Sequence, residues 1–227
     1  MYFNFFFLFL LFLIFLQKYM YSYGMVFFDR FYPNSDFNEY KKKYIIKNIC
    51  KSYLLFTLFF STTLPLFCGF FLNEWSNFSF YVCGCFYTAI DLGGLIYVKG
   101  LPKATVIHHT TVGIIGILNL LTDYNKHGYY KSFLIYCYFS IIPFIVNFYL
   151  GSRYLIHDSN KRKFLAKLSY LIYTFSLVLN IICEIILFYN NEYSWTIYFY
   201  ILLFLMIFND DITLIRFLRK ESIDNKN

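Results

Sequence analysis

Six continuous apolar stretches, separated by short polar connections, dominate the chain after residue 50. Each stretch is near the roughly 20 residues that a transmembrane helix needs. The runs are continuously apolar rather than alternating, which indicates helices and not the strands of a barrel. The pattern therefore predicts an all-α, multi-pass transmembrane bundle with six core helices, at residues 52–72, 78–98, 104–121, 132–150, 164–190 and 193–215.

The N-terminal segment, residues 1–28, is also strongly apolar and is predicted to be either a membrane anchor or a secretory signal. The anchor is favoured because a basic start and a small-residue cleavage site are both missing. Cleavage would also place the lysine-rich 41–51 segment on the lumenal side. The expected organisation is an anchor, a polar linker at 29–44, a transmembrane domain at 45–220 and a polar tail at 221–227.

Composition supports a membrane protein. Hydrophobic residues make up 59% of the 227 residues and charged residues only 15%, whereas soluble domains have about a quarter charged. The net charge of +7 does not indicate a nucleic-acid partner, because Lys and Arg lie in the short connections, where they act as topology signals. The six cysteines form no CxxC pair and are expected to be ordinary buried thiols.

The distribution of basic residues predicts an orientation. Five Lys lie in 41–51, two in 99–103, five Lys or Arg in 153–167 and four in 216–226, all in connections predicted for one side. Only Lys126 and Lys131 lie in connections predicted for the other side. The positive-inside rule then places the C-terminus in the cytosol.

Asp91 and the adjacent pair His108-His109 stand inside neighbouring apolar segments and are the candidate catalytic residues. In a helical hairpin that turns near residues 100–102, Asp91 lies about 15 Å above the turn and the histidines about 10 to 12 Å. Contact between the carboxylate and one imidazole would leave the other ring nitrogen as a base. The alternative is a purely structural contact between two helices.

A metal site is not expected, because adjacent positions on a helix do not present two ligands to one ion. The two other histidines, His127 and His157, fall in connections. Gly93-Gly94 is expected to permit close helix packing rather than to bind a nucleotide, so no soluble cofactor is predicted. Glu184 is expected to snorkel to the lumenal surface, and Asp210-Asp211 to form a solvated or paired helix end near the cytosol.

The segment Tyr87–Asn119, YTAIDLGGLIYVKGLPKATVIHHTTVGIIGILN, resembles the TLC-domain family, which includes translocating-chain-associated, longevity-assurance and ceroid-lipofuscinosis membrane proteins. The shared pattern is an Asp with aromatic neighbours in one helix and His-His early in the next. The resemblance implies a helical bundle of the endoplasmic reticulum or another endomembrane that handles membrane lipids. The ceramide synthases of this family join acyl-CoA to a sphingoid base, and His108, His109 and Asp91 would match their catalytic positions.

Three functions are consistent with these residues. The first is lipid handling or lipid homeostasis without catalysis, favoured because the acidic cluster of the synthases is replaced at 133–144 by FLIYCYFSIIPF. The second is a ceramide synthase-like N-acyltransferase, with acyl-CoA as co-substrate. The third is a trafficking or interaction protein of the membrane, with protein partners that the sequence does not identify.

Overall fold

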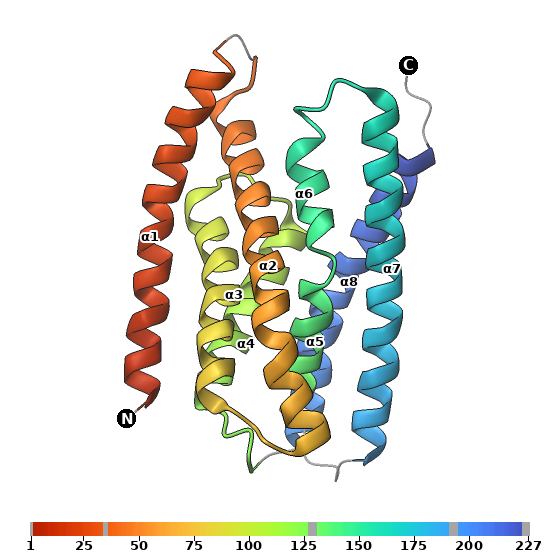
Figure 1. The fold of residues 1–227 in the computed structure, drawn as a ribbon. Helices are drawn as coiled ribbons and strands as arrows, with labels where there is room; N and C mark the ends of the chain where they lie inside the picture. Colours follow the sequence, from red (N-terminus) through yellow and green to blue (C-terminus); the bar gives the residue numbers. More distant parts are fainter. Residues whose placement is uncertain (1, 34–35, 127–130, 191–194, 224–227) are drawn as a thin grey trace.

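The computed structural model describes residues 2–33, 36–126, 131–190 and 195–223, and within these ranges all regular structure is helical. The helices, drawn in Figure 1, are α1 (Tyr2–Phe31), α2 (Glu39–Leu72), α3 (Asn77–Tyr97), α4 (Lys103–Leu121), α5 (Lys131–Ile141), α6 (Phe144–Ser152), α7 (Ser159–Asn190) and α8 (Trp195–Ile223). The predicted all-α bundle is therefore confirmed, although its elements differ in detail from the prediction.

The helices run side by side, and α6 continues in the general direction of α5 after the bend between them (Figure 1). The closest neighbours are α2 with α6, α3 with α4, α1 with α3, and α7 with α8. The end of α1, the start of α2 and the C-terminal part of α8 lie at one end of the bundle, and the N-terminus lies at the other (Figure 1). Segments that are distant in the sequence therefore meet inside the bundle at matching heights.

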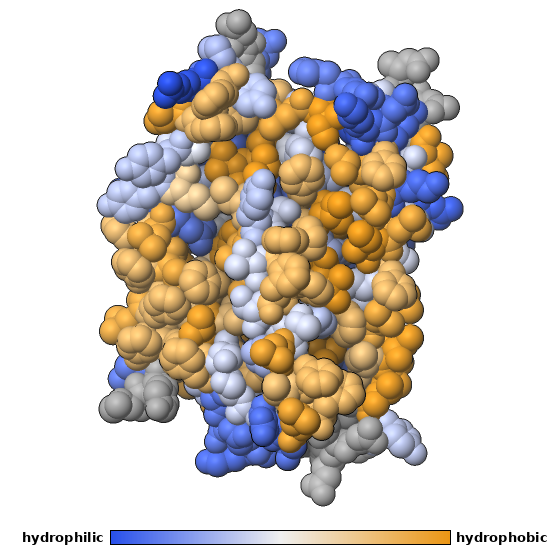
Figure 2. Space-filling view, viewed as in Figure 1, coloured by the Kyte–Doolittle hydropathy of each residue, from blue (hydrophilic) through white to orange (hydrophobic). Residues whose placement is uncertain are grey.

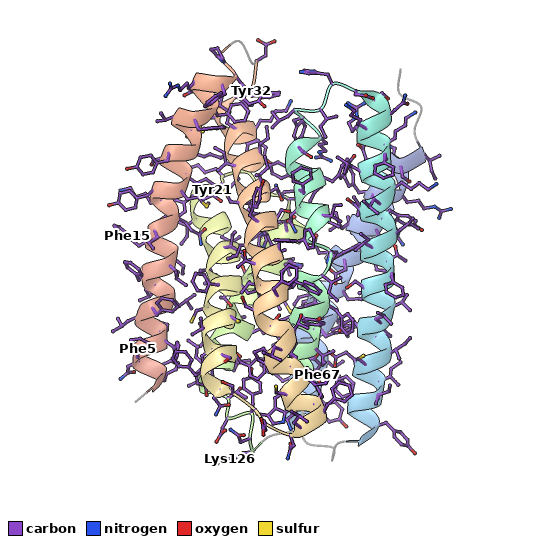
Figure 3. The ribbon with its side chains drawn as sticks, viewed as in Figure 1. Phe5, Phe15, Tyr21, Tyr32, Phe67 and Lys126 are labelled. Carbon is purple, nitrogen blue, oxygen red and sulfur yellow. The ribbon has the colours of Figure 1, made fainter. Side chains whose placement is uncertain are left out.

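Five helices, α1, α2, α3, α4 and α7, are long and apolar enough to cross a membrane, and α5 with α6 makes a sixth if the pair is one span. Apolar side chains cover the middle of the face seen in Figure 2, with hydrophilic residues toward both ends. Phe5 and Phe15 on α1 point away from the bundle and are 63% and 52% exposed (Figure 3). The predicted span at 193–215 corresponds to α8, and its first two residues lie outside the described ranges.

The predicted helix at 132–150 is wrong as a single element. It is divided into α5 and α6, whose axes are bent by 44° at Ile142 and Pro143. Proline has no backbone N–H and disfavours a helical conformation in the residue before it, so the helix ends there. Because of this bend, α6 does not continue along the axis of α5, and the interior of the bundle next to the bend changes shape.

The segment predicted as a polar linker is helical at both of its ends. Helix α1 continues to Phe31, and α2 begins at Glu39, well before residue 44. Asn38 caps α2 by accepting a hydrogen bond from the Lys41 backbone N–H at 2.9 Å. Because α2 starts early, the lysines of the 41–51 segment lie on a helix, and some of them face the bundle.

Helix α1 is attached to the core by a polar contact. The Gln17 side chain donates from Nε2 to the Ala89 carbonyl of α3 at 2.5 Å and is buried. Gly93 lies directly against this glutamine, where a Cβ would overlap its side chain. Gly94 leaves room for Lys47 in the same way, so the predicted role of Gly93-Gly94 in close packing is confirmed.

Candidate functional site

Asp91 and His109 meet as the hairpin geometry predicts. Asp91 is fully buried on α3, and His109 is 4% exposed on α4. The His109 Nδ1 lies 3.1 Å from the Asp91 Oδ1, although the ring N–H is not aligned for a hydrogen bond. The two groups form the centre of a polar cluster inside an otherwise apolar bundle.

Two lysines of α2 complete this cluster. The Lys51 ammonium pairs with the Asp91 carboxylate, and the Lys47 Nζ lies 2.8 Å from the His109 Nε2. Both lysines are buried, with 3% exposure for Lys47 and 8% for Lys51. Sequence analysis assigned them to a topology signal. Their i, i+4 spacing, which places them on one helix face together with Asn48, was the signal that could have identified them.

His108 points in a different direction from its neighbour. The two rings are 5.5 Å apart and nearly perpendicular, at 82°. The His108 Nδ1 lies 3.2 Å from the Asp210 Oδ2 of α8, and the described contacts give its Nε2 no partner. The His108 side chain retains 14% exposure. Of the two histidines, His108 therefore has the free nitrogen, while both nitrogens of His109 face charged groups.

The predicted helix end at Asp210-Asp211 requires a correction. Asp210 is paired, as one of the two expectations states, but its partner is His108. Asp211 is 4% exposed and accepts hydrogen bonds from the Tyr136 hydroxyl at 3.1 Å and the Tyr173 hydroxyl at 2.6 Å. Helix α8 packs against α4 and α7, and its Asp211 reaches Tyr136 of α5, so this face does not point to solvent.

A cavity of about 350 Å³ lies between the helices, and its lining includes the two lysines, the two histidines, Asp210 and Asp211. Charged and polar side chains form part of its wall and aliphatic or aromatic residues form the rest. The wall includes Lys47, His108, Asp210, Arg153, Leu55 and Val146. Pro143 and Asn147 also line it, so the cavity lies where α6 bends away from α5.

A second, smaller pocket of about 50 Å³ continues beyond Tyr87, which lines both spaces. Its wall is almost wholly apolar and includes Val112, Ile115 and Ile141. Gly84 and Gly116 contribute no side chains there, and the close contacts that a Cβ would make at either position show how tightly α3 and α4 pack. A polar chamber and an apolar chamber are thus adjacent in the bundle.

The same histidines and Asp91 form the described group most suited to a metal, with donor atoms within 4.8 Å of one another. Two of the three donors are, however, already in contact with ammonium groups, Asp91 with Lys51 and His109 with Lys47. A divalent cation would have to displace or deprotonate these lysines. The donor set therefore fits proton transfer and polar recognition better than metal binding.

Glu184 does not reach the surface, contrary to the snorkelling prediction. It is 4% exposed, and its Oε1 accepts a hydrogen bond from the Tyr200 hydroxyl at 2.7 Å. The reason is that its face of α7 packs against α8 instead of pointing outward. Cys85 is buried as expected, whereas the other five cysteines are partly exposed free thiols. His157 is exposed in the α6–α7 connection, and His127 lies outside the described residues.

Comparison with protein-family models, curated proteins and solved structures finds no match to this chain.

Proposed function

We propose that this chain is a multi-pass membrane protein that binds a membrane lipid, with the headgroup in the polar cavity and the hydrocarbon against its apolar walls. The observation that carries the proposal is a cavity of about 350 Å³ with charged groups inside a bundle whose outer surface is largely apolar. Pockets for amphiphiles combine an apolar lining with a few placed polar groups.

The resemblance of Tyr87–Asn119 to the TLC-domain family supports the same proposal from the sequence. It adds an endomembrane, such as the endoplasmic reticulum, as the location. The basic connections add a cytosolic C-terminus, because the positive-inside rule favours that orientation. Labelling of single cysteines from either side of sealed membranes tests the orientation, with Lys126→Cys expected to be protected where Arg219→Cys is labelled.

The test of lipid binding is lipid analysis of the purified protein. We expect specific lipids to copurify with the wild type and to be depleted in the double variant His108→Ala/His109→Ala. His157→Ala is the matched control, because it removes an exposed histidine of a connection. Unchanged lipid content in the double variant, with the fold retained by circular dichroism, would contradict the proposal.

A second candidate is N-acyl transfer from acyl-CoA to a sphingoid amine, and the pairing of His108 with Asp210 favours it. An imidazole whose Nδ1 faces a carboxylate leaves Nε2 to act as a general base. His108 would take a proton from the amine as the amine nitrogen attacks the thioester carbonyl. The C–N bond would form, the C–S bond would break, and the CoA thiolate would receive the proton.

Amide formation by reconstituted protein, measured by mass spectrometry, separates the two candidates. We expect Asp210→Asn to lower turnover if acyl transfer occurs, because the base has lost the carboxylate next to its Nδ1. Absence of amide from folded protein across several acyl chain lengths would leave lipid binding as the function.

A further inference from the structure

Two cations that line the cavity have no carboxylate partner among the described residues. Lys47 is 3% exposed, and its ammonium contacts the neutral acceptor His109 Nε2. Arg153 follows the last residue of α6 and donates from Nη2 to the Tyr154 hydroxyl at 2.8 Å, while its Nε is buried without a partner. Aromatic rings of Tyr154 and Phe217 hold the guanidinium at 4.8 and 4.7 Å.

The packing of α6 on α2 brings these two cations to the same region. Gly151 lies against α2, where a Cβ would be 2.8 Å from the Ile49 side chain and 3.1 Å from the Ile45 carbonyl oxygen. Lys47 stands between those two isoleucines in the sequence, and Arg153 follows Gly151 by two residues. Both cations line the cavity, and the ring of Tyr44, which precedes Lys47 by three residues on α2, lies 6.2 Å from the ring of Tyr154, the residue after Arg153. This contact places Arg153 near the helical turn that bears Lys47.

The carboxylates in the cavity wall and the adjacent Asp91 are already engaged. Asp91 pairs with Lys51, Asp210 contacts His108, and Asp211 accepts two tyrosine hydroxyls. A buried charge without a counter-charge is costly, and an anionic ligand would remove that cost. Among the described residues, none of these three carboxylates forms an ion pair with Lys47 or Arg153.

We infer that Lys47 and Arg153 form a phosphate subsite, and that the lipid in the cavity carries a phosphate headgroup. A guanidinium fork and an ammonium are the groups that bind phosphate oxygens in proteins. Leu55 and Val146 on the same cavity wall would contact the hydrocarbon next to the headgroup. This inference rests on the proposed function and specifies the class of lipid.

The test uses the full chain, delipidated in detergent and followed by native mass spectrometry. The probes are phosphatidic acid, diacylglycerol with the same acyl chains, and inorganic phosphate. Arg153→Gln removes the guanidinium charge, and Arg153→Lys keeps a charge but loses the fork. Arg219→Gln is the matched control, because Arg219 is exposed and does not line the cavity.

We expect Arg153→Gln to weaken phosphatidic acid binding by about tenfold or more, as for the loss of a hydrogen bond to a charged group, with diacylglycerol binding unchanged. Arg153→Lys should retain part of the affinity, and Arg219→Gln all of it. Unchanged phosphatidic acid binding in Arg153→Gln, or equal losses for both lipids, would overturn the inference.

The remaining arms separate this inference from the proposed function. If inorganic phosphate alone binds as tightly as phosphatidic acid and depends on Arg153, the subsite is supported and its ligand is the free anion. If the wild type retains neither lipid, the proposed function fails. Binding of inorganic phosphate then tests the Lys47 and Arg153 subsite separately. If lipids bind but phosphate is not distinguished, lipid binding stands and the headgroup inference fails.

Discussion

Removal of the Lys51 charge should destabilise the bundle strongly. In Lys51→Met, the fully buried Asp91 carboxylate loses the ammonium that pairs with it and keeps only the unaligned contact with His109. One of its oxygens, Oδ2, already has no hydrogen-bond partner. The variant thus leaves an anion in the interior without direct compensation, which is the case in which a broken buried pair is most costly.

The expected loss is about 3 to 5 kcal/mol of unfolding free energy, the range for removal of one partner of a buried ion pair. For a chain of this size, about 2 to 4 °C per kcal/mol gives a decrease in Tm of about 6 to 20 °C. The double variant Lys51→Met/Asp91→Leu removes both charges and should recover most of the loss, because an apolar pair of similar volume is tolerated in place of a buried ion pair.

Thermal unfolding in detergent, followed by circular dichroism of the helices, measures Lys51→Met, Asp91→Leu and the double variant. Lys43→Met is the control, because Lys43 also forms an ion pair, with Glu39 one turn earlier on the same helix, but at the surface. Little change in stability is expected there. A shift in Lys51→Met no larger than in the control, or a double variant whose loss is the sum of the single losses, would refute the reasoning.

Two further predictions concern packing and pH. Gly151→Ala should cost about 1 to 3 kcal/mol, because its Cβ would meet Ile49 and the α2 backbone, and denaturant unfolding in detergent measures it; wild-type stability would contradict the close contact. A hydrogen bond from Asn77, with smaller contributions from other partners, lowers the pKa of Asp123 in the α4–α5 connection to about 2. Its stabilising contribution should be present above pH 3.8, the ordinary pKa of the group, and disappear as the pH falls through about 2. The Tm difference between wild type and Asp123→Asn should therefore vanish near pH 2, and a pH-independent difference would contradict it.

The helices and the position of Asp91 opposite His109 could be predicted from the sequence for a simple reason. A run of apolar residues has a length, and the rise per residue of a helix converts that length into a height. Within one hairpin the turn is short, so heights on its two arms can be compared directly. Height alone predicts contact of Asp91 with one of the two histidines, and the rotation of α4 decides that this histidine is His109.

The rest of the site depends on how non-adjacent helices pack. The lysines of residues 41–51 are consistent with either a solvated connection or a helix face that points into the bundle. The early start of α2 places them on a helix and favours the second alternative. Pro143 indicates a break, but the 44° bend and the cavity beside it depend on the neighbours of α6.

By itself, the sequence determined an all-helical chain with long apolar helices and a polar centre in one hairpin, because hydropathy and helical rise are properties of local segments. The tertiary structure alone decided that Lys51 neutralises Asp91, that Asp210 supports His108, and that Lys47 and Arg153 remain without a carboxylate. The two pairings join α2 to α3 and α4 to α8. Electrostatic energy depends on the separation of charges in space, and separation along the chain does not specify it.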